Sequence, residues 1–112
     1  MKWLALHIGG QKWGVYLVAA GSKYLVSDGG DRCIGMCDYD KCRIYVSKAV
    51  DSSARDDALW HELMHALLHV TGAESAYGGD PEADEHIVSA LTPAMHRLLR
   101  DLGFRFPKGT AE

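Results

Sequence analysis

The apolar pattern of the chain changes near residue 51, and this change most constrains the fold. Before it, short runs rich in Trp, Tyr, Val and Ile are separated by glycine pairs and by the turn-like residues 38–41, as is typical of strands. After it, apolar residues recur at helical spacing in two longer segments. The pattern predicts an α+β fold, with a small antiparallel sheet of about three to four strands followed by two helices. The expected strands are residues 2–8, 13–20 and 43–48, with a weaker run at 23–27.

Both expected helices have recognisable ends. The first should cover residues 54–70, because residues 51–53 offer side-chain oxygens for its start and Gly72 can end it. Asp80 followed by Pro81 predicts the start of a second helix, which runs to about Leu102. In the first helix the expected core residues are Leu59, Leu63, Leu67 and Val70. In the second they are Val88, Leu91, Met95, Leu98 and Leu102.

Composition narrows the class of protein. A chain of 112 residues, 47% hydrophobic and 24% charged, fits one folded domain over residues 1–112, and it lacks an uncharged run long enough for a membrane span. Twelve basic and fifteen acidic side chains give a net charge of −3, so no overall positive field attracts phosphate backbones. We therefore expect neither a nucleic acid nor a membrane as partner.

The three cysteines indicate a reducing cellular compartment rather than a disulfide-bonded framework. Cys33, Cys37 and Cys42 are odd in number and lack a Cys-x-x-Cys spacing, which disfavours a full disulfide framework and a four-thiolate zinc site. Reduced thiols in a cytoplasmic protein are the expectation, with a Cys33–Cys37 bridge or a cysteine-bound metal as alternatives. The apolar residues 13–20 are expected to form a strand rather than an export signal, because Gln11 and Lys12 interrupt the run.

The segment from His61 to His65 indicates metal chemistry. On a helix, positions i and i+4 project from one face, so both imidazoles can reach one ion. Glu62 then stands where it can accept a proton from a water bound to that ion. Because the expected core residues lie on the opposite side of this helix, the histidine face is free to line a cleft. The alternative is a surface helix that carries two histidines without a metal.

A catalytic zinc needs a third protein ligand and one open position. Glu85 is the first choice, because its phase on the second helix points it toward the first. Glu82, one turn earlier, is the alternative, and His86 is less well placed, about 100° around the helix from Glu85. His69 continues the line of histidines but stands about 12 Å along the axis from His61, too far to share its ion.

Several segments together resemble a known family. They are LWHELMHALL at residues 59–68, EHIV at 85–88, LTPAM at 91–95 and LLRD at 98–101. These resemble small zincin-like metallopeptidases encoded by phages and prophages and, more distantly, the ImmA/IrrE-type and SprT-like metallopeptidases. WGV at 13–15, GMCD at 35–38 and RIYV at 43–46 look like the strands that precede the motif helix. The resemblance spans most of the chain and implies a single zincin-like domain.

The resemblance also implies a ligand set. A downstream glutamate is the third zinc ligand of such proteins, and this role is carried here onto Glu85. The ImmA/IrrE-type pattern has a Glu-Ala-Asn-like element that residues 82–84 partly match, which keeps Glu82 open as the ligand. The chain departs from the metzincin pattern, because Thr71 stands where a third histidine would follow His65.

The expected activity is peptide-bond hydrolysis, with zinc held by His61, His65 and Glu85 and with Glu62 as the general base. Tyr77 or His86 could stabilise developing charge, and an aspartate could orient a ligand imidazole. The candidates for that aspartate are Asp38, Asp57 and Asp84. The substrate would be a peptide or protein, a regulator protein among the candidates, lying along the edge of the strand at residues 43–47. The alternatives are a non-catalytic zinc-binding module of phage origin that binds a regulator protein, and a metal-free domain.

Overall fold

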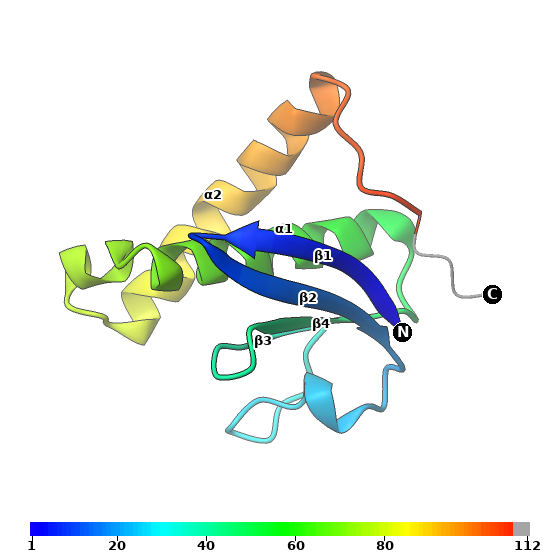
Figure 1. Ribbon diagram of the computed structural model, residues 1–112, viewed down its shortest axis with the longest axis horizontal. Helices are drawn as coiled ribbons and strands as arrows, with labels where there is room; N and C mark the ends of the chain where they lie inside the picture. The colour runs from blue at the N-terminus through cyan, green and yellow to red at the C-terminus, as the bar shows by residue number, and fades with distance from the viewer. Residues whose placement is uncertain (109–112) are drawn as a thin grey trace.

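A computed structural model of the chain describes residues 1–108 and confirms the α+β class. Its described residues form a four-stranded sheet and two α-helices, joined by short 3-10 segments η1 and η2 (Figure 1). The strands are β1 (Lys2–Ile8), β2 (Gln11–Val18), β3 (Gly35–Asp38) and β4 (Arg43–Ser47). The helices are α1 (Ser52–Val70) and α2 (Pro81–Asp101), with η1 at Lys23–Leu25 and η2 at Ala73–Tyr77.

The sheet is mixed, so the expectation of a purely antiparallel sheet is wrong. Its strand order is β1-β2-β4-β3, in which β1 pairs with β2 and β3 with β4 in antiparallel fashion. The two central strands β2 and β4 are parallel, from Gly14 opposite Arg43 to Val18 opposite Ser47. A parallel pair needs a long connection, and residues 19–42 provide one that contains η1 and β3. This connection also contains β3, which lies at the edge of the sheet and which only the family resemblance, not the apolar pattern, indicates as a strand.

The weak strand expected at residues 23–27 is also wrong. Lys23–Leu25 forms η1, because the Ser22 side chain accepts a hydrogen bond from the Tyr24 amide and caps a tight turn. Leu25 is fully buried in this turn, while Val26 makes only an isolated bridge with Arg32. The apolar residues of this run therefore cover the sheet without extending it.

Helix α1 packs on one face of the sheet. Asp51 caps it by accepting a hydrogen bond from the Ala54 amide, as the sequence predicts, and Gly72 follows its end with a φ of 75°. The shared core consists of alternate strand residues and one helix stripe: Trp13, Val15, Leu17, Ile44, Val46, Leu59, Leu63 and Ala66. Leu67, expected in this stripe, is 40% exposed, because Ala66 takes its place against the sheet.

Helix α2 buries a different face from the one expected. Asp80 caps it and Pro81 opens it as predicted, but its buried residues are Val88, Thr92 and His96. The expected Leu91, Leu98 and Leu102 are 54%, 60% and 75% exposed. The buried positions repeat every four residues, which is the ridge that α2 presents where it crosses α1. The C-terminal part of α2 extends beyond α1 (Figure 1), and within residues 1–108 the three leucines remain exposed.

Among residues 1–108, no helix has the length and apolar character needed to cross a membrane.

Candidate metal centre

A cleft opens between α1, the edge strand β3 and the start of α2. Its volume is about 770 Å³. It is lined by residues of all three elements, among them Gly35, Cys37, His61, Glu62, His65, Pro81, Asp84 and Glu85. The strand that borders the cleft is β3, which is the edge strand of the sheet. Strand β4 is hydrogen-bonded on both sides, to β2 and to β3. The expectation that the strand at residues 43–47 offers a free edge is therefore wrong, and β3 has that edge instead.

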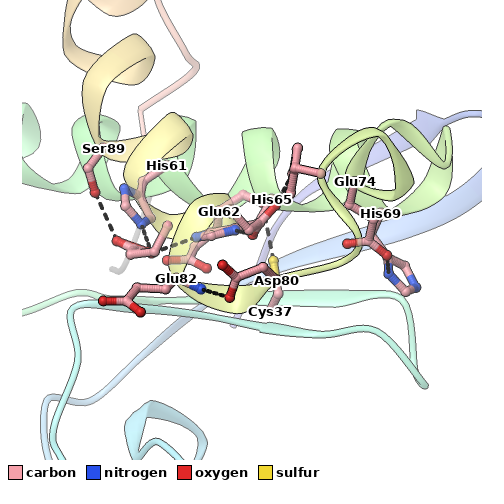
Figure 2. A network of polar contacts seen from close by, with 12 residues as sticks. Cys37, His61, Glu62, His65, His69, Glu74, Asp80, Glu82 and Ser89 are labelled. Carbon is pink, nitrogen blue, oxygen red and sulfur yellow. Dashed lines mark hydrogen bonds and ion pairs between the residues drawn. The ribbon is translucent and has the colours of Figure 1, made fainter.

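The two motif histidines converge on one carboxylate of α2. Nε2 of His61 lies 3.2 Å from Oε1 of Glu85, and Nε2 of His65 lies 2.9 Å from the same oxygen. The three candidate ligand atoms lie within 4.8 Å of one another. Figure 2 shows His61 and His65 side by side on α1, each with a dashed contact leaving its ring on the same side of the helix. Residues 24 and 20 positions apart in sequence thus meet at one point.

This donor set fits zinc. Two imidazole nitrogens and one carboxylate oxygen form a known catalytic ligand set, which leaves a fourth position open. With bonds of about 2.0–2.1 Å, tetrahedral ligands stand about 3.3 Å apart, close to the 2.9 and 3.2 Å between the histidines and Glu85. All three candidate ligand atoms lie within 4.8 Å of one another, so they are close enough to share one ion.

Asp84 orients one of the candidate ligands. Its Oδ2 accepts a hydrogen bond of 2.6 Å from Nδ1 of His65, which directs Nε2 toward Glu85. Its Oδ1 accepts a hydrogen bond of 2.6 Å from the Tyr77 hydroxyl, and this bond raises the pKa of Tyr77 to about 12. A carboxylate that holds a ligand imidazole from behind is a regular feature of zinc sites.

The other two candidate aspartates lie elsewhere. Asp38 accepts a hydrogen bond from the Lys41 amide in the turn after β3. Asp57 pairs with the buried His96 of α2 at one end of the cleft. Of the three, only Asp84 contacts a candidate metal ligand.

Glu85 is held in place from its other oxygen. Ser89, one turn later on α2, donates a hydrogen bond of 2.9 Å to its Oε2. Burial raises the pKa of Glu85, but the hydrogen bonds from Ser89 and His65 and the nearby His61 outweigh it and lower the pKa. Glu85 is therefore poised as a charged ligand. Glu82, the alternative, is exposed and does not line the cleft.

Glu62 is half-buried between α1 and β3. A Cβ on Gly35 would lie 3.0 Å from the Glu62 Cγ, so any larger residue would press on the Glu62 side chain. The Cys37 thiol donates a hydrogen bond of 3.1 Å to the Glu62 backbone carbonyl. Burial raises the pKa of Glu62, although the charges of His61 and His65 oppose this effect. A raised pKa suits a carboxylate that must both accept and release a proton.

The remaining candidates His69, His86 and Tyr77 do not line the cleft. His69 pairs with Glu74 at 3.0 Å, as Figure 2 shows, and its ring packs 4.3 Å from that of Tyr39. His86 is exposed, and Tyr77 uses its hydroxyl on Asp84. Cys33, Cys37 and Cys42 are unpaired, so the alternative Cys33–Cys37 bridge is not formed. Burial raises the pKa of Cys37 strongly, which keeps it a neutral thiol.

Sequence reasoning missed the residues that support the site. Ser89 could have been found, because it stands four positions after Glu85 and therefore on the same helix face. Gly35 and Cys37 carried no such signal, because their contact with Glu62 depends on where β3 lies relative to α1. No family model matches this chain, and no curated protein or solved structure matches it either.

Substituting Asp84→Asn tests the orienting contact. Removal of this carboxylate charge should weaken zinc affinity by about 10- to 100-fold, as is usual for partners behind a ligand histidine. The measurement is a zinc titration in competition with a chromophoric chelator. Asp38→Asn is the matched control, because Asp38 caps a turn and contacts no candidate ligand. Equal affinities for the two variants would contradict the role of Asp84.

Proposed function

We propose that this protein is a zinc-dependent peptidase of the HExxH type. One observation carries the proposal: Nε2 of His61 and of His65 meet the same oxygen of Glu85, in a cleft that Glu62 also lines. A metal site with structural use alone has no need of an open fourth position with a base beside it. The resemblance to small zincin-like metallopeptidases of phages agrees with this function.

Each group of the chain has a separate task in the proposed reaction. His61, His65 and Glu85 bind zinc, and Asp84 keeps the His65 ring in orientation. When bound, zinc supplies Lewis acidity, which acidifies water and polarises a peptide carbonyl. Glu62 accepts a proton from the attacking water and passes it to the leaving amine nitrogen, while the carbon–nitrogen bond breaks. The products are a new carboxyl terminus and a new amino terminus.

The substrate is proposed to be a peptide segment. The cleft is bordered by β3, which among the described residues pairs with a strand on one side only, so an extended chain can pair with its other edge. We place the protein in the cytoplasm, because its three unpaired cysteines suit a reducing compartment.

A second function, binding of a regulator protein without cleavage, is favoured by the exposed leucines of α2. Leu91, Leu98 and Leu102 are more than half exposed along one side of α2. Exposed apolar residues in a row are typical of protein–protein contacts. A zinc-binding module that holds a regulator protein through α2, without cleaving it, would use this surface and leave Glu62 idle.

Cleavage of internally quenched peptides by the zinc-loaded protein separates the two functions. The peptidase cleaves at least some sequences of a mixed library, stops when a chelator removes zinc, and resumes when zinc is returned. Mass spectrometry of the products identifies the bond that is broken. Stoichiometric zinc without cleavage of any library member would favour the binding module, and absence of zinc after reconstitution would overturn both.

A further inference from the structure

We propose that the cleft selects peptides with a basic side chain near the cleaved bond, and that Asp57 is the residue that binds this side chain. The inference rests on the proposed peptidase function and concerns the same cleft. It follows from the direction of the cleft, from the charges that line it and from the hydrogen bonds those charges already make.

The cleft runs lengthwise between α1 and β3. Gly35 approaches the Glu62 side chain, Cys37 contacts the Glu62 carbonyl, and Tyr39 lies against His69. The strand and the helix therefore advance in the same direction. Ahead of the metal centre, the helix wall of the cleft is formed by Ala54, Asp57 and Ala58, with Ile34 on the opposite wall.

Asp57 stands one helical turn before His61. Four residues correspond to about 6 Å along the helix axis, whereas an extended peptide advances about 3.3 Å per residue. A substrate chain in the cleft therefore passes Asp57 about two residues from the bond at the metal. A lysine or arginine at such a position can lay its aliphatic stem along Ala54, Ala58 and Ile34 and bring its charge to the carboxylate.

Apart from Glu62, the proposed base beside the metal centre, Asp57 is the carboxylate of the cleft lining that keeps an oxygen without a described partner. Asp84 uses both oxygens on His65 and Tyr77, and Glu85 uses both on the histidines and Ser89. Asp57 uses Oδ1 on His96 and has no described partner for Oδ2, and its side chain is 58% exposed. No lysine or arginine is among the described residues that line the cleft. An incoming cation therefore meets no competitor there.

His96 fixes the direction in which Asp57 points. The histidine is only 6% exposed and comes from the crossing helix α2, so the contact ties the carboxylate to the core rather than to a mobile surface group. Its Nδ1 contacts Oδ1 of Asp57 and leaves Oδ2 without a described partner. A preoriented carboxylate binds a cation with less loss of side-chain entropy.

The experiment compares matched peptides that place Lys, norleucine or Glu at each of three positions on either side of the cleaved bond. We expect the wild type to prefer Lys over Glu at one position by about tenfold in kcat/KM, and Lys over norleucine by about three- to fivefold, as for an exposed ion pair. The preference should decrease in about 1 M salt, where charges are screened within about 3 Å.

Asp57→Asn isolates the charge, because asparagine can still accept the hydrogen bond from His96. This variant should lose the Lys preference to within about twofold, and Asp57→Lys should reverse it in favour of Glu. Asp56→Asn is the matched control, because Asp56 pairs with Arg55 at 3.0 Å and does not line the cleft. Zinc content and circular dichroism of each variant establish that the fold is intact.

Binding separates this inference from the proposed function. The same fluorescent peptides are titrated into zinc-loaded Glu62→Gln protein and followed by anisotropy. A Lys preference in binding that Asp57→Asn removes would support the inference even if the wild type cleaves nothing. Cleavage with no dependence on residue 57 would overturn the inference and leave the peptidase intact. Neither cleavage nor binding of any peptide would overturn both.

Discussion

His61→Ala is expected to reduce zinc from one ion per chain to none at micromolar protein. The Nε2 atoms of His61 and His65 and one oxygen of Glu85 lie within 4.8 Å of one another, so removal of one of them leaves two donors for the ion. The loss of affinity should exceed about 100-fold, the upper end of what loss of an outer partner costs. Elemental analysis after gel filtration measures the zinc directly.

Two matched pairs make this result specific. His69→Ala removes a histidine two turns further along α1, where the ring pairs with Glu74 outside the cleft, and should leave zinc content unchanged. Glu85→Ala should weaken zinc binding as His61→Ala does, whereas Glu82→Ala should not, because Glu82 does not line the cleft. A loss of zinc on Glu82→Ala but not on Glu85→Ala would show that the start of α2 adopts another phase in the metal-bound protein.

The parts of the fold that depend on local sequence could be predicted. Asp51 and Asp80 cap the two helices where their side chains predict it, and the histidines of α1 share a face because four residues make about one turn. These features involve residues a few positions apart, so no knowledge of the tertiary structure is needed. Glu85 does not belong with these local features, because its phase is judged against an expected leucine stripe that α2 does not bury.

The parts of the fold that depend on long-range packing could not be predicted from the sequence. The parallel pairing of β2 with β4 follows from the path of residues 19–42, and hydrophobic alternation within a strand does not encode the direction of its neighbour. For the same reason the free edge was assigned to the strand at residues 43–47, which is hydrogen-bonded on both sides.

The face of α2 shows most clearly why apolarity alone misleads. The sequence favours the leucine-rich stripe as the core, yet α2 buries Val88, Thr92 and His96. At about 100° per residue, Thr92 and His96 each lie within about 20° of Glu85 around the helix. The face that contacts α1 is thus the face that holds the candidate ligand. Burying the leucines instead would turn Glu85 away from His61 and His65.

Glu62→Gln is expected to lower the rate of peptide cleavage by about 100- to 10,000-fold while zinc content stays at that of the wild type. Glutamine fills the same space beside Gly35 but cannot accept the proton of the attacking water. Zinc should remain, because Glu62 is not among the three converging donors. The measurement is kcat on the best peptide of the library, with zinc determined on the same samples.

Glu74→Gln is the control for a lost carboxylate on this side of the protein, because Glu74 pairs with His69 and does not line the cleft. It should cleave at the wild-type rate. If Glu62→Gln cleaved at more than about a tenth of that rate, the proton would have to move through another group, because general-base catalysis contributes at least about 100-fold. If the Glu62→Gln variant lost zinc, Glu62 would be a metal ligand. Only loss of cleavage with zinc retained assigns Glu62 to the chemistry rather than to the metal.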